Sequence, residues 1–143
     1  MFILVNLKTK TNMYNLFTQQ AMNIILIAQE EAKFLQQNQV GTQHLFLALV
    51  EQKKSDVRKI LRSCGVRLNN TRAKVKKIIP TRSSRSSFLK PEPRMILPLS
   101  SKTKELLQFT AETAKEAGHT CVVPAHILFC LLNQDRNMAL TVI

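Results

Sequence analysis

Glycine is scarce in this chain of 143 residues, with three present and none close to another. A phosphate-cradling loop of the form G-x-x-x-x-G-K-[ST] needs closely spaced glycines, because its backbone N–H groups must approach the phosphates. No such loop occurs in the sequence. Cysteine is also sparse: the count of three is odd, and no C-x-x-C spacing occurs, which favours a reducing compartment over a disulfide framework.

Long apolar runs are missing as well. The longest have five or six residues, far short of the roughly 20 that span a bilayer as a helix. The opening "MFILVNLK" has too short an apolar core for a secretory signal, and no small-residue cleavage site follows it. We therefore expect no membrane span, and a protein that works in the compartment where it is made.

The net charge of +12 lies in the middle of the chain. Residues 53–94 hold fourteen Lys or Arg against two carboxylates, and the rest of the chain nets zero. We favour a basic face that meets an acidic protein partner, with Lys74, Lys76 and Lys77 as candidate contacts. The alternative is a basic, nucleic-acid-associated helical protein that binds through residues 53–94. Tryptophan is absent and Phe88 is the only aromatic residue of that segment, so stacking on bases is poorly supplied.

The chain contains an internal repeat. Residues 16–50 align with residues 98–132 at an offset of 82 positions and without a gap. The two stretches "VGTQHLFLALV" and "VVPAHILFCLL" place His44 and His126 at equivalent positions before an apolar run. Two copies of one supersecondary unit are the simplest explanation.

Each copy reads as helical. Apolar residues of the first copy recur at intervals near 3.6 and predict one buried stripe: Phe17, Ala21, Ile24, Ala28 and Leu35. Polar residues are expected to face away from it: Gln20, Gln29, Glu30 and Lys33. Thr18 or Ser100 is expected to cap the first helix of its copy. Gly118 suits a left-handed residue at the end of that helix, whereas its counterpart Gln36 suits it less well.

Further helices are expected beyond this pair. The second helix of each copy should begin near Thr42 or Pro124, because proline is tolerated in a first turn. In copy one, additional helices are predicted over about 55–64 and 70–79. The stretch 80–98, rich in proline and serine, reads as a linker or exposed loop.

These elements predict one all-α fold with two pseudo-symmetric repeats of about four helices each, the second shortened at its C-terminus. Repeat one covers 13–79, the linker 80–98 and the incomplete repeat two 99–143, after an N-terminal extension at 1–12. Because copy two lacks counterparts to residues 62–79, we expect uncovered apolar surface, and hence a dimer or association with a larger assembly.

His44 and His126 are predicted to be structural. A general base would need a nucleophile and an orienting group nearby, and the sequence shows neither. A histidine at the start of a packed helix can instead bond a backbone carbonyl. No catalytic or cofactor-binding residue is therefore proposed, and the protein is not expected to be an enzyme.

Zinc is the rival interpretation for the second histidine. Four residues of zinc-ligand type lie within twelve positions: His119, Cys121, His126 and Cys130. Their spacing matches no common zinc finger, and copy one lacks three of the four, so we expect no metal. Two further pairs of acidic residues, at 30–31 and at 112 and 116, are expected on solvated helix faces rather than at an acid–base site.

The quoted motifs resemble a known family. "FTQQAMNIILIAQEEAKFL", "VGTQHLFLALV" and "CGVRL" are similar to the Clp repeat at the amino end of class C Clp ATPases, and copy two is similar more loosely. The resemblance covers roughly residues 13–143. It implies an all-α domain of two repeats that docks adaptors or substrates, here without the ATPase modules.

The same resemblance suggests partners and a location. Expected partners are Clp ATPase or protease subunits, adaptors and substrates, with no cofactor. A plastid, meaning the chloroplast stroma, is favoured, with a bacterial-type cytoplasm as the alternative.

The resemblance also points to binding positions. Some bacterial relatives bind phosphoarginine through an acidic residue of their G-T-E-H motif, and this chain has Gln43 and Ala125 there. The candidate positions Thr18 and Thr42 keep their hydroxyls, whereas Pro124 replaces the motif threonine in copy two. Because the carboxylate is missing, we expect no useful phosphoarginine binding.

Overall fold

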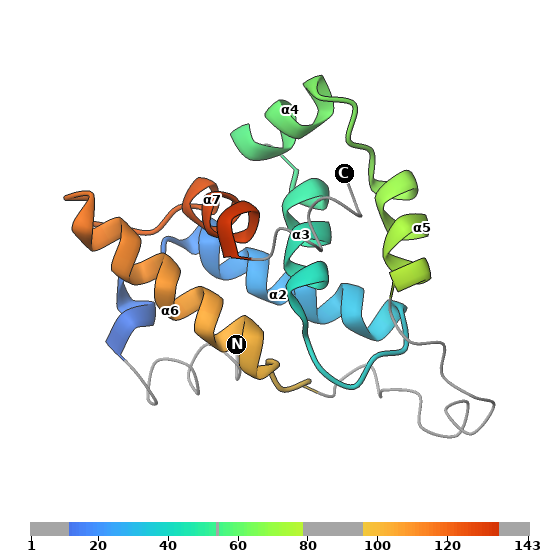
Figure 1. Cartoon of the computed structure of the whole chain (residues 1–143), viewed down its shortest axis with the longest axis horizontal. Helices are drawn as coiled ribbons and strands as arrows, with labels where there is room; N and C mark the ends of the chain where they lie inside the picture. The colour runs from blue at the N-terminus through green and yellow to red at the C-terminus, as the bar shows by residue number, and fades with distance from the viewer. Residues whose placement is uncertain (1–11, 54, 79–95, 135–143) are drawn as a thin grey trace.

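The computed structural model describes residues 12–53, 55–78 and 96–134, and these ranges contain a 3-10 turn and six α-helices (Figure 1). The elements are η1 (Asn12–Leu16), α2 (Gln19–Phe34), α3 (Thr42–Glu51), α4 (Asp56–Ser63), α5 (Leu68–Ile78), α6 (Ser101–Glu116) and α7 (Pro124–Gln134). No β-strand occurs in the described ranges. The all-α prediction is confirmed. None of the helices found there combines the length and the apolar character that a bilayer crossing requires.

The long first helix of each copy begins at the expected cap. The Thr18 hydroxyl accepts a hydrogen bond from the N–H of Ala21 at 3.2 Å. The Ser100 hydroxyl accepts one from the N–H of Thr103 at 3.1 Å. These bonds satisfy amides that have no partner inside the helix, which explains why both copies start at the same register.

The same two helices end in matching left-handed turns. Gln36 has φ of 58° and Gly118 has φ of 80°. In each copy the next residue donates its N–H five positions back, from Gln37 to Ala32 and from His119 to Ala114. Gln36 therefore adopts the geometry that its side chain suits poorly, because the helix end is fixed by the packing of the whole repeat.

A pseudo-twofold axis relates the copies, and the backbone displays it directly. Two isolated parallel bridges pair Phe17 with Val122 and Val40 with Leu99. Under the offset of 82, Phe17 corresponds to Leu99 and Val40 to Val122, so the two bridges exchange. The start of the long helix in one copy therefore lies beside the start of the short helix in the other.

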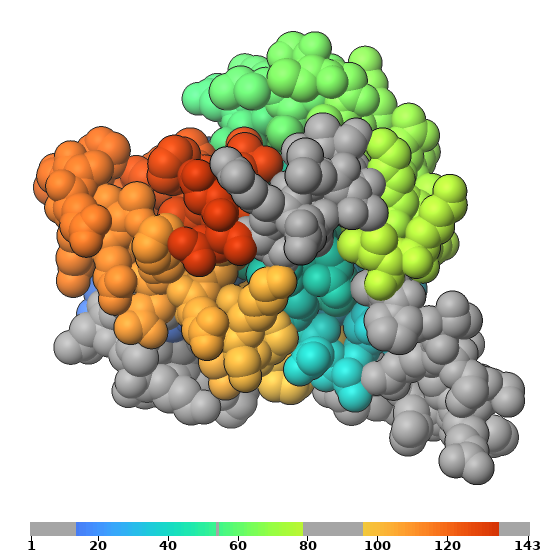
Figure 2. Space-filling view, viewed as in Figure 1, coloured from blue at the N-terminus to red at the C-terminus, as the bar shows by residue number. Residues whose placement is uncertain are grey.

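The core is built around α3. Every residue from His44 to Val50 is buried. In Figure 1, α3 lies between α7 and α5, with α2 crossing it, and α3 contacts all three helices. Figure 2 shows that α4, α5, α6 and α7 form most of this face of the molecule, while little of α2 is seen. The helix α3 thus contacts helices of both repeats, and α2 and α4 also contact α7 of the second repeat.

Two polar residues of α2 depart from the prediction. Gln29, expected to face away, is 4% exposed and bonds the backbone of Leu97 in both directions, donating at 2.6 Å and accepting at 2.8 Å. Glu31, expected on a solvated face, is 2% exposed. Both were misplaced because helical periodicity in one segment does not reveal which distant segments pack against the helix.

The third and fourth helices of copy one lie close to their predicted ranges. α4 begins after the Ser55 cap, as the range 55–64 predicts. α5 begins two residues earlier than predicted, at Leu68, whose side chain packs partly against the core. Most of the predicted linker lies outside the described residues; near its end Leu97 is buried, whereas Ile96 and Pro98 on either side of it are exposed.

Candidate functional site

The two repeat histidines make the same bond in both copies. His44 Nδ1 accepts the N–H of Gly41 at 2.8 Å, and His126 Nδ1 accepts the N–H of Val123 at 3.0 Å. Each acceptor lies three residues after the residue that precedes its helix, α3 or α7. The partner is an amide N–H of the same copy, whereas the sequence suggested a carbonyl. The ring holds the chain entering the helix, much as a capping-box side chain does.

His44 is poorly suited to proton transfer. It is 1% exposed, and burial lowers its pKa to about 4, although the charge of Glu31 opposes the shift. At neutral pH the ring is uncharged, and its acceptor nitrogen is already used by Gly41. The other nitrogen, Nε2, is buried without a hydrogen-bond partner in the structure.

His126 has a different second contact. Its Nε2 lies 2.7 Å from His119 Nδ1, and the ring centroids are 4.9 Å apart. Burial and the neighbouring ring of His119 lower the pKa of His126. Cys121 is exposed and Cys130 is fully buried. Within the described ranges, no three His, Cys, Asp or Glu side chains come together in a way that could hold a metal ion.

The positions suggested by the family resemblance are spread over both copies. Thr18 is occupied in capping α2. Thr42 is the buried first residue of α3, and Gln43 is half-buried, with its side-chain amide directly beside Gly41. Ala125 is exposed on α7. Thr42 also lines a small hollow of about 140 Å³ that includes Lys102 and Glu105.

The lysines proposed as protein contacts lie on α5. Lys74, Lys76 and Lys77 are all exposed. Lys76 Nζ lies 5.8 Å from the centroid of the Phe34 ring, and the Arg72 guanidinium stacks over the same ring at 4.8 Å. Phe34 is 61% exposed. The cation–π contacts keep this aromatic ring at the surface beside basic groups.

A cluster that the sequence did not reveal joins α2, α3 and α5. The Arg72 guanidinium donates to both oxygens of Glu31, with Nε at 3.1 Å from Oε2. Burial alone would raise the pKa of Glu31, but the bonds and charge of Arg72 lower it overall. Glu51 lies 3.9 Å from Arg72, and burial together with the neighbouring Glu31 raises the pKa of Glu51 to about 7. Residues 31 and 72 are far apart in sequence, so no local pattern indicates the pair.

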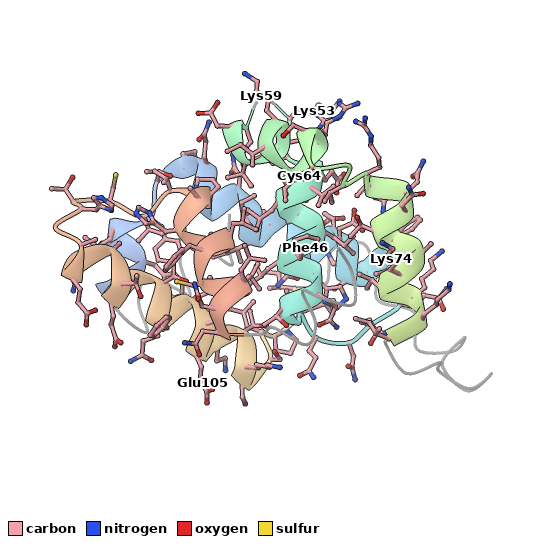
Figure 3. The ribbon with its side chains drawn as sticks, turned by 45° about the horizontal axis from the view of Figure 1, so that its top comes forward. Phe46, Lys53, Lys59, Cys64, Lys74 and Glu105 are labelled. Atoms are coloured by element: carbon pink, nitrogen blue, oxygen red, sulfur yellow. The ribbon has the colours of Figure 1, made fainter. Side chains whose placement is uncertain are left out.

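A larger hollow lies where α3 ends and α4 and α5 face each other. Its volume is about 330 Å³. We name it the α4–α5 hollow; it is lined by Val50, Glu51, Lys53, Arg58, Arg62, Val66, Arg67, Leu68 and Asn69. Figure 3 shows Lys53 and Lys59 projecting at the α4 end of the molecule, with Lys74 on α5. Four of the lining residues are cationic, which concentrates positive charge around one concave surface.

Comparison with known proteins places this arrangement in a family. Residues 16–143 match the Clp repeat (R) N-terminal domain family. The chain belongs to this family. Two relatives are the chloroplastic chaperones ClpC1 of Oryza sativa subsp. japonica and ClpC of Pisum sativum, each 33% identical over 131 residues. The match covers 92% of this chain but 14% and 13% of theirs, so the chain spans about one seventh of their length.

Solved Clp N-terminal domains share the fold. The N-terminal domain of the caseinolytic protease associated chaperone ClpD from Arabidopsis thaliana superposes with a TM-score of 0.72 and 27% identity, covering 90% of this chain and 83% of that one. The N-terminal domain of Hsp104 from Candida albicans gives a TM-score of 0.62 at 21% identity, covering 86% and 77%. The latter likeness concerns the fold only. The predicted repeat architecture is confirmed.

Proposed function

We propose that this chain is a non-catalytic, protein-binding domain of the Clp protease and chaperone system. It would dock adaptors or substrates, or associate with the Clp ATPase and protease complex. The observation that carries the proposal is the family match over residues 16–143, combined with the twofold helical core shared with the ClpD N-terminal domain. In such a domain the core is occupied by packing, and binding is left to the surface.

The geometry of the histidines supports the non-catalytic part. A general base must offer a free nitrogen lone pair to a reacting group. In both repeats the accepting nitrogen is bonded to a backbone amide, and His44 has almost no exposure to solvent. His44 is therefore unavailable for acid–base catalysis, and the accepting nitrogen of His126 is occupied as well.

We place the protein in a plastid. The relatives named above are chloroplastic chaperones at 33% identity, and class C Clp ATPases are the proteins that the sequence motifs resemble. Immunogold labelling or a fluorescent fusion in the source cell tests the location: signal confined to a compartment other than the plastid contradicts it.

The function is tested with purified components. The full chain, a chloroplast ClpC-type chaperone and its protease partner are mixed, and association is followed by size-exclusion chromatography and by the degradation rate of an unfolded reporter protein. We expect co-elution, or slower degradation because this chain competes for adaptors and substrates. A chain that neither co-elutes nor changes the degradation rate contradicts the proposal.

Salt dependence separates this function from nucleic-acid binding. Binding to a phosphate backbone loses affinity steeply with salt and is indifferent to sequence when it is purely electrostatic. Tight binding of one oligonucleotide sequence that survives high salt, with no Clp partner bound, would favour the nucleic-acid alternative through residues 53–94.

A further inference from the structure

We propose that the α4–α5 hollow binds an acidic peptide segment of a protein partner, seating apolar side chains on its floor and carboxylates at its rim. This inference rests on the proposed function, because it names the chemistry of the docked partner and the surface that receives it.

The first support is a group of exposed cations that form no ion pair within the described part of the chain. Lys53, Arg62 and Arg67 are exposed at the hollow. Within the part of the chain that the structure describes, none of the three forms an ion pair with a carboxylate. By contrast, Arg72 nearby is held by Glu31. The cations of the hollow are therefore available to carboxylates of a partner, and arginine can bind them with two parallel bonds.

The second support is the acidic residue in the wall. Among the described lining residues, Glu51 carries the one carboxyl group. Burial and Glu31 raise the pKa of Glu51 to about 7, so this group is partly protonated near neutral pH. It repels an incoming acidic segment less than an ordinary glutamate would, because its carboxyl group shares a hydrogen bond with Glu31 inside the protein.

The third support is the floor. Val50 and Val66 are 3% and 5% exposed, and Leu68 packs partly against the core. An apolar floor ringed by a few polar groups is the usual construction of a binding pocket, and its volume of about 330 Å³ accommodates one or two side chains.

Shape favours a peptide over a nucleic acid. A single-stranded nucleic acid binds along a groove with aromatic platforms for its bases. The described lining of the α4–α5 hollow has no aromatic residue and is one local depression. Charge complementarity combined with an apolar floor suits alternating acidic and apolar side chains.

The experiment uses fluorescence anisotropy on the full chain. The probe is a short fluorescein-labelled peptide of alternating glutamate and leucine, and the control probe has glutamine in place of glutamate. The test variant combines Arg62→Gln and Arg67→Gln. The charge-matched control combines Lys104→Gln and Lys115→Gln, two residues that are exposed on α6 and lie outside the hollow. Thermal unfolding verifies that both variants fold.

We expect the acidic probe to bind and the glutamine probe to bind much more weakly. Loss of two charged hydrogen bonds should weaken binding roughly tenfold or more in the test variant. The control variant should stay within about threefold, because exposed charges outside the site act through screened solvent.

Three results overturn the inference. Equal weakening in both variants means a general field effect, and equal binding of the two probes means that carboxylates are not recognised. A mixed-sequence single-stranded DNA that displaces the probe and loses affinity in the same variant assigns the hollow to phosphates. Failure of the proposed function is distinct: then no Clp component binds the natural protein, whereas failure of this inference leaves Clp binding unchanged in the Arg62 and Arg67 variant.

Discussion

The equivalent histidines of the two repeats make the same hydrogen bond but lie in different environments. His44 and His126 both accept the amide N–H three residues earlier. His44 is 1% exposed and lies within the electrostatic influence of Glu31, whereas His126 is half-buried and touches a second histidine at the surface. The capping bond is local and repeats with the sequence, while burial depends on which helices cover the site.

The same contrast holds for the glutamate pair of α2. Glu30 corresponds to Glu112, and both are exposed. Glu31 corresponds to Thr113; it is buried in copy one, where it forms an ion pair with Arg72 of α5. Repeat one is therefore stabilised by a long-range ion pair that repeat two, in its described part, does not have.

The largest expected effect comes from the apolar core. Phe46, which lies on α3 (Figure 3), is fully buried, and its counterpart Leu128 on α7 is half-buried. Phe46→Ala should lower the free energy of unfolding by about 3–5 kcal/mol, because a large cavity forms in a close-packed interior. Leu128→Ala should cost less than half of that. Urea unfolding followed by circular dichroism measures both, and equal losses would mean that the repeats are packed equally well.

The ion pair of repeat one ranks next. Glu31→Gln should lower the free energy of unfolding by about 2–4 kcal/mol, because Arg72 loses its charged partner in a mostly buried site. Glu30→Gln is the matched control: Glu30 is exposed, with a 3.5 Å contact to Lys33, and should change stability by about 0.5 kcal/mol or less. If the two variants unfold at the same urea concentration, the ion pair between Glu31 and Arg72 does not stabilise the fold.

Phosphoarginine recognition can be used to compare the two copies as binding sites. A charged hydrogen bond contributes about 1.5–3 kcal/mol, so the natural chain, with Gln43 and Ala125, should bind free phosphoarginine very weakly. Gln43→Glu should gain roughly ten- to a hundredfold in affinity. Ala125→Glu should gain less, because Pro124 offers neither a hydroxyl nor a backbone donor. Isothermal titration calorimetry reports each; micromolar binding by the natural protein would contradict the prediction.

The buried histidine should make stability depend on pH. The folded pKa of His44, about 4, lies below the ordinary value of 6.5, so below pH 6.5 the unfolded chain takes up a proton that the folded chain refuses. Stability due to this group should fall by about 2 kcal/mol between pH 6.5 and 5.

The control isolates that contribution from its neighbours. Glu51, with its pKa raised to about 7, works in the opposite direction, gaining stability as the pH falls from 7 toward 4.5. The free energy of unfolding is measured by urea at several pH values for the natural chain and for His44→Gln. Because the variant retains Glu51, the difference between the two pH profiles gives the contribution of His44. His126→Gln should differ less from the natural chain, and a His44→Gln profile parallel to the natural one would exclude a buried neutral ring.

The smallest effect concerns the helix ends. Gln36→Gly should raise the free energy of unfolding by about 0.5–1 kcal/mol, because glycine adopts the left-handed φ of 58° without a Cβ penalty. The reciprocal change Gly118→Gln, at φ of 80° and with open space around the Cβ position, should lower it by a similar amount. Thermal unfolding with a calorimeter resolves both; a loss of stability in Gln36→Gly would show that the glutamine side chain contributes more than its backbone strain costs.

Local chemistry explains what could be predicted. Thr18 and Ser100 caps, the apolar stripes and the turn at Gly118 are features of neighbouring residues, and each appears in the structure where the sequence placed it. The predictions for Gln29 and Glu31 were wrong for the opposite reason. Their partners, Leu97 and Arg72, lie 68 and 41 positions away, and helical periodicity carries no information over such distances.

The sequence by itself determined the helices, their caps and the twofold repeat, because each depends on residues within a few positions or on comparison of the chain with itself. Only the tertiary structure decided which polar groups are buried and which basic residues of 53–94 line a common hollow. The Glu31–Arg72 pair and the α4–α5 hollow each form only where two or three helices pack together. The free energy of that packing depends on close contact and desolvation across the whole fold.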